Sequence, residues 1–164
     1  MPKRDDVGED EGFGFFRDTW WIGHVTVAEA ESIVREEAEL IGWLDHLART
    51  PEEFEILASA IEDQQVDHLP HSLHAVAAGR GLQRYVVEGQ PSPLDGLEVG
   101  VAGLAHAMSA MRCLTAASCR WHMHDRSWSD CPVVFFAALP WRVEVLAELV
   151  SEEGCGLDLD ADRS

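Results

Sequence analysis

Residues 113–139 read CLTAASCRWHMHDRSWSDCPVVFFAAL, and this stretch decides the fold. Both of its ends are small or apolar, whereas the middle is polar and carries two histidines between two cysteines. Short apolar runs bounded by polar residues or proline are typical of strands. The sequence therefore predicts a strand over 113–119 and a second, fully buried strand over 132–139, with a polar loop between them.

Two amphipathic helices are predicted ahead of this stretch. Thr26 and Glu29 have the spacing of a capping box, in which each side chain satisfies a backbone amide at the helix start. Thr50, Pro51 and Glu53 mark a second helix start soon afterwards. With almost no linker, the two helices form an antiparallel pair or a sharp corner. Apolar residues recur at helical spacing in both helices: Ile33, Leu40, Ile41, Leu44, Leu47, Phe54, Leu57, Ala58 and Ile61.

Three further elements surround the predicted strands. A helix opens at Asp95 and Glu98, another runs from Trp141 to Glu153, and 155–159 is predicted as an edge strand. The order of elements favours an α+β fold, a small sheet covered by helices with an N-terminal helical pair. We expect a single domain over 1–164, with short acidic tails at about 1–11 and 158–164. The first of these helices has a small-residue face that indicates close packing, formed by Gly100, Gly103, Ala107 and Ala110.

The composition indicates a bacterial, cytoplasmic protein. The first four residues, MPKR, lead into acidic residues rather than an apolar signal core, and the longest apolar run, 133–141, is too short to span a bilayer. The four cysteines are therefore expected to stay reduced. A single lysine and the absence of asparagine are typical of a GC-rich bacterial genome.

The net charge of −18 is spread unevenly along the chain. Residues 27–65 hold eleven acids against Arg35 and Arg49, a net charge of −9. Such a field repels nucleic-acid phosphates and anionic membranes, so neither is expected as a partner. Two explanations of the charge stay open: a solvated helical face, or a surface that binds a basic protein.

The polar loop carries the residues that are most able to perform chemistry. Cys119, His122, His124 and Cys131 have the spacing Cys-x2-His-x-His-x6-Cys. Two thiolates and two imidazoles form a set that suits tetrahedral zinc, although this spacing is not a diagnostic zinc pattern. The sequence thus predicts a zinc site, with an ordinary surface loop as the alternative.

Cys119 and His122 also permit a catalytic interpretation. A thiol at the end of a strand, next to an imidazole, is the arrangement of a cysteine nucleophile with its base. No glycine-rich turn for an oxyanion follows, however, and Trp121 stands in the loop. Metal-activated water is the second catalytic route that the same loop permits.

Part of the chain resembles a group of uncharacterised bacterial proteins. In these a helix leads to a strand that ends in Ser-Cys-x-Gly-His, and a Pro-Val-Val-x-Phe strand follows. Ser118, Cys119 and His122 match the first strand end, and 132–136 matches the second strand, whereas Trp121 replaces the glycine. The resemblance covers about a quarter to a third of the chain and implies no particular activity.

Three hypotheses for function follow. The first is a small acidic binding or regulatory protein, of the kind associated with immunity or defence, with a zinc-type site in the loop. The second is an enzyme that uses the same loop. The third is an acidic interaction protein without metal or catalysis, whose partner is a basic protein.

Overall fold

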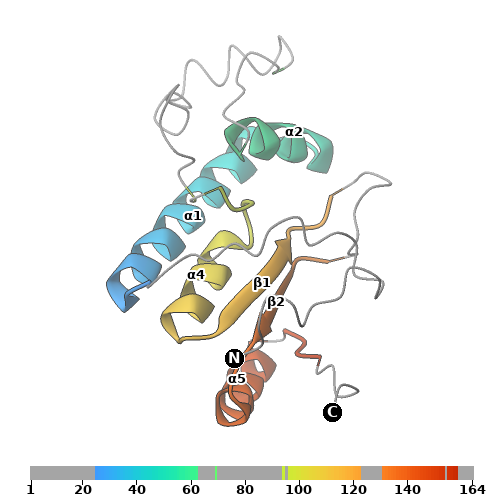
Figure 1. Cartoon of the computed structure of the whole chain (residues 1–164). Coiled ribbons are helices and arrows are strands. Elements are labelled where there is room, and N and C mark those ends of the chain that lie inside the picture. The colour runs from blue at the N-terminus through green and yellow to red at the C-terminus, as the bar shows by residue number, and fades with distance from the viewer. Residues whose placement is uncertain are drawn as a thin grey trace, which may run out of the picture.

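The computed structural model describes residues 25–62, 69, 94, 96–122, 131–153 and 155–158. Within these ranges the chain forms four helices and a two-stranded antiparallel sheet, which is the predicted α+β fold with an N-terminal helical pair (Figure 1). The elements in chain order are α1 (Val27–Leu47), α2 (Pro51–Glu62), α4 (Ala102–Ala110), β1 (Leu114–Cys119), β2 (Val133–Ala137) and α5 (Pro140–Glu152).

Both N-terminal helices start at the predicted caps. The Thr26 hydroxyl accepts a hydrogen bond from the Glu29 amide at 3.2 Å, and the Glu29 carboxylate accepts one from the Thr26 amide at 2.8 Å. At α2 the Thr50 hydroxyl caps the Glu53 amide, but the Glu53 carboxylate reaches the Arg49 amide instead of that of Thr50. Helix α2 leaves the end of α1 at a sharp corner (Figure 1). Their shared core contains Leu40, Leu44, Leu47, Leu57, Ala58 and Ile61.

Helix α4 starts later than the sequence predicts, at Ala102 rather than near Asp95. The preceding residues form turns, in which Gly96 and Gly100 have φ of +81° and +98°. Such angles favour glycine because it has no Cβ. Glu98 therefore lies in a turn and does not cap the helix.

A carboxylate from α1 caps the start of α4. The side chain of Val101, the N-cap residue of α4, makes no capping hydrogen bond. Instead the buried Glu37 accepts hydrogen bonds from the amides of Gly100, Ala102 and Gly103 at 2.8, 2.9 and 2.8 Å. A negative charge at a helix N-terminus is also favoured by the helix dipole. Glu37 thus fixes the position of α4 on α1.

Gly103 permits this close approach of the two helices. A Cβ at this position would lie 2.5 Å from Glu37 Oε2 and 3.2 Å from both Cα and Cγ2 of Val34. The small-residue face therefore packs against α1 at Gly103.

The sheet of β1 and β2 lies on the side of α4 away from α1, and α5 follows β2 in the chain (Figure 1). Thr115 pairs with Phe136 and Ala117 with Phe135, so Ala116 forms a β-bulge. Strand β2 is half-buried along Val133–Phe136 and exposed at Ala137, so the prediction of full burial is wrong. Within the described residues the sheet has two strands, so β2 has a neighbouring strand along one edge and is open along the other.

The prediction of a strand over 155–159 is wrong for the described residues 155–158, which have no strand pairing. Helix α5 matches its predicted position within one residue at each end, and Leu146 attaches it to Met108 and Cys113. The predicted acidic tail at 1–11 lies outside the described residues, and so does the stretch at 13–22, which is rich in phenylalanine and tryptophan.

Alanine substitutions at two helical glycines test the packing of α4 on α1. Gly42→Ala should stabilise the protein by about 1 kcal/mol, because alanine favours helix and nothing lies within 4 Å of the added Cβ. Gly103→Ala should destabilise it by about 2 kcal/mol despite the same gain in propensity, because the methyl group displaces the Glu37 carboxylate. Urea unfolding followed by circular dichroism measures both. Equal stabilisation by the two substitutions would contradict the close contact.

Candidate functional site

The end of β1 is held against α2 by a buried arginine. Arg120 Nη2 lies 3.0 Å from Glu55 Oε1 and 3.2 Å from the Ser59 hydroxyl, and Nη1 forms an ion pair with Glu62. Its Nε donates a further hydrogen bond to Glu55 at 3.3 Å. A buried guanidinium is stable only when carboxylates balance its charge and accept its N–H groups. Arg120 thus fixes the end of β1 at one face of α2.

One of these carboxylates also binds the turn before α4, and a third carboxylate belongs to that turn. Glu62 Oε1 accepts a hydrogen bond from the Val99 amide at 2.7 Å. Glu98, in that turn, accepts one from the Arg120 amide at 2.7 Å. The three segments that form the site, α2, the turn at 96–100 and the end of β1, are therefore connected by charged hydrogen bonds.

His122 lies between two of these carboxylates. Its Nδ1 is 2.7 Å from Glu55 Oε1, and its Nε2 is 3.0 Å from Glu98 Oε1. The side chain is 25% exposed, so solvent reaches the ring. An imidazole with a carboxylate at each nitrogen is arranged to carry two protons and to donate from both.

The charges of the site shift three pKa values. Burial would lower the pKa of His122, but hydrogen bonds to Glu55 and Glu98 outweigh burial and raise it. Burial would raise the pKa of Glu55, but hydrogen bonds from Arg120 and His122 outweigh it and lower the pKa. For Glu62 burial dominates, and its pKa is raised although Arg120 opposes the shift.

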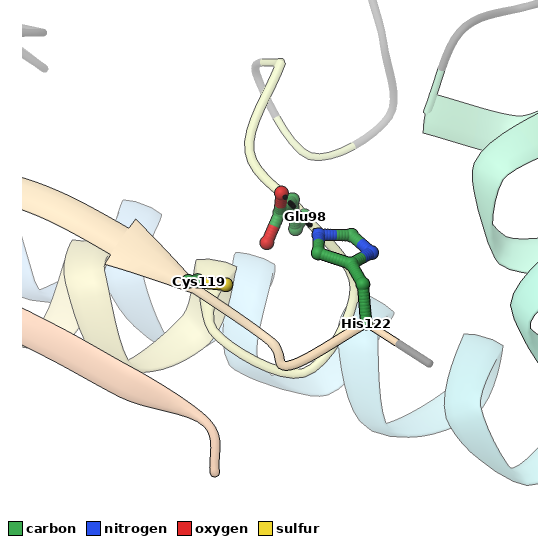
Figure 2. Close-up of side chains that lie close together, drawn as sticks. All are labelled: Glu98, Cys119 and His122. Carbon is green, nitrogen blue, oxygen red and sulfur yellow. Dashed lines mark hydrogen bonds and ion pairs between the residues drawn. The ribbon is translucent and has the colours of Figure 1, made fainter. Parts of the chain in front are cut away.

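Three residues of the site could hold a metal ion. Ligand atoms of Glu98, Cys119 and His122 all lie within 4.8 Å of one another (Figure 2). Figure 2 shows the Glu98 carboxylate and the His122 ring turned toward each other, with Cys119 at the tip of β1. Thiolate, imidazole and carboxylate are the three kinds of side chain that bind zinc.

The structure brings together only part of the predicted zinc set. Cys119 and His122 are in one group, as expected, and Glu98 joins them from a turn that the sequence assigned to a helix start. Cys131 is described and exposed, but it is not part of this group. His124 lies outside the described residues. The four-residue set therefore stays a prediction.

The turn after β1 departs from ordinary backbone geometry. Trp121 has φ of +74°, a left-handed conformation that glycine adopts readily and that bulky residues rarely adopt. This is the position at which the resembling bacterial pattern has glycine. The turn at Trp121 leaves Arg120 pointing into α2 and His122 toward Glu98.

Comparison of the chain with models of known protein families, with curated protein sequences and with solved structures finds no match. Among the described helices, none combines the length and apolar character needed to cross a bilayer.

The proton on His122 gives a pH dependence to test in metal-free protein. Because its pKa is raised on folding, its stabilising effect is complete below the unfolded-state value of about 6.5 and is lost as pH rises through the folded-state pKa. The free energy of unfolding should therefore fall more between pH 6 and pH 9 in the wild type than in His122→Gln, with chelator present. An identical pH profile in the two proteins would contradict a protonated His122 that donates to both Glu55 and Glu98.

Proposed function

We propose that this chain is a small metal-binding protein of the binding or regulatory class, with Zn²⁺ held by Glu98, Cys119 and His122. One observation carries the proposal: residues from the turn at 96–100 and from the end of β1 converge so that a sulfur, a nitrogen and an oxygen lie within 4.8 Å. Tetrahedral zinc holds such atoms at about 2.0–2.3 Å from the ion, which small side-chain movements allow here.

The surroundings of His122 also suit a metal ligand. Histidines that bind zinc through one nitrogen usually donate the other N–H to a carboxylate, which fixes the ring orientation. Glu55 is placed for this role, 2.7 Å from Nδ1, while Nε2 faces Glu98. Zinc would replace the proton at Nε2 and the thiol proton of Cys119, so metal uptake should weaken at acidic pH.

A metal-dependent enzyme is the second candidate. Three protein ligands leave one tetrahedral position for water or substrate, which is the arrangement of catalytic zinc sites. The Glu98 side chain is 31% exposed and that of His122 is 25% exposed, so such a position would be open to solvent. Cys119 is only 1% exposed, which disfavours its role as a free nucleophile, because reactive cysteines need access to substrate.

Exposed acidic and apolar side chains of α1 and α5 support a basic protein as the partner. Most carboxylates of α1 are exposed, and α5 exposes Trp141, Val145 and Leu149 at successive helical turns. Apolar residues beside acidic ones, here Glu144 and Glu148, are suited to a partner with apolar and basic side chains. The same charge disfavours nucleic acid and anionic membranes.

Zinc content tests the proposal directly. Protein purified without chelator should carry about one zinc ion per chain, and Cys119→Ser and His122→Ala should lose it. Glu55→Gln should lower the affinity about tenfold, because it supports His122 without binding the ion. Elemental analysis and competition with a chromophoric chelator measure these effects.

The control variants Cys155→Ser and His46→Ala change exposed residues outside the group and should retain zinc. His124→Ala and Cys131→Ser decide whether the loop supplies a fourth ligand. Wild-type protein without metal, or full zinc content in Cys119→Ser, would refute the site.

A further inference from the structure

A cleft lies beside the proposed metal site, on the other side of Glu55. It has a volume of about 400 Å³ and lies between the end of α1, the start of α2 and the turn after β1. Phe54, Pro51 and Trp121 supply apolar walls, and Asp45, Arg49 and Glu55 supply charged groups. With Arg120, four of the nine lining residues are charged. A cleft of this size that combines aromatic walls with convergent polar groups is typical of a small-ligand site.

Trp121 connects this cleft with the strained turn. Its side chain is 41% exposed although its backbone has φ of +74°, where glycine would be free of strain. Conformations of this kind are concentrated at functional sites, because the surrounding structure must compensate for them. The turn therefore presents an accessible indole to the cleft at a cost in stability.

The charged residues that line the cleft balance one another. The guanidinium of Arg120 is already balanced by Glu55 and Glu62. Asp45 and Arg49 are both exposed and have opposite charges, so neither sign prevails at the entrance. The net charge of −18, and aromatic rings whose faces attract cations, then decide in favour of positive ligands.

We propose that this cleft binds a cationic group, a quaternary ammonium or a guanidinium, against the indole of Trp121 with Asp45 as its counter-charge. The ligand is either a free small molecule or a side chain of a basic peptide. This binding does not depend on zinc, because none of the three proposed metal ligands lines the cleft.

Binding of matched ligands to the full chain tests the proposal by calorimetry, with chelator present. Choline should bind, and its neutral isostere 3,3-dimethylbutan-1-ol should bind at least about fivefold more weakly, because it lacks the charge that the ring attracts. A peptide with one arginine flanked by glycines is the second probe. Tighter binding of choline indicates a small-molecule ligand, and tighter binding of the peptide indicates a protein partner.

Two pairs of variants separate ligand recognition from folding. Trp121→Ala and Trp121→Gly should both weaken binding at least about fivefold. Trp121→Gly should nevertheless melt at a higher temperature than Trp121→Ala, because glycine adopts positive φ freely. Trp121→Phe should retain binding. Asp45→Asn should weaken binding of the cation, and Arg49→Gln should strengthen it; an anionic ligand would give the reverse.

The proposal is overturned if neither probe binds, if the neutral isostere binds as tightly as choline, or if binding survives in Trp121→Gly. It is also overturned if Arg49→Gln weakens the complex. Because all measurements are made without metal, absence of zinc in the purified protein would leave these results unaffected.

Discussion

The buried ion pairs of Arg120 are the interaction on which the rest of the site depends. The Arg120 guanidinium binds Glu55 and Glu62 of α2, and the backbone amide of Arg120 donates a hydrogen bond to Glu98 in the turn before α4. Loss of one partner from a buried pair leaves an unbalanced charge and commonly costs about 3–5 kcal/mol. The residues on both sides of Arg120, Cys119 and Trp121, have their places fixed by it. The ion pairs of Arg120 thus hold the chain at both candidate sites, since Arg120 lines the cleft and follows the metal ligand Cys119 directly.

The sequence predicts the elements of this fold well where the signals are local. The Thr26 capping box and the cap at Thr50 predict where two helices begin, because each hydrogen bond joins residues only three positions apart. The prediction failed where tertiary structure decides. The sequence pattern predicts a helix start at Glu98, but positive φ at Gly96 and Gly100 forms turns there, and the Glu98 carboxylate accepts a hydrogen bond from the Arg120 amide. A short apolar run likewise could not reveal that the sheet has two strands within the described residues and leaves β2 half-buried.

The site itself was only half predictable. Residue type and spacing in the sequence indicate Cys119 and His122 as metal ligands. The carboxylates of Glu55 and Glu98 cannot be distinguished by sequence from the other acidic residues of a solvated surface. Their partners lie far away in the sequence: 65 positions separate Glu55 from Arg120, and 63 separate Glu37 from Gly100. One signal was present, since Glu55, Ser59 and Glu62 recur at i, i+4 and i+7 and therefore share a side of α2.

The most direct test of the central claim is the zinc X-ray absorption spectrum of protein purified without chelator. The account predicts one sulfur neighbour at about 2.3 Å and nitrogen or oxygen neighbours at about 2.0–2.2 Å, including one imidazole. A first shell without sulfur, as expected for ions bound to surface carboxylates, would contradict a site built on Glu98, Cys119 and His122.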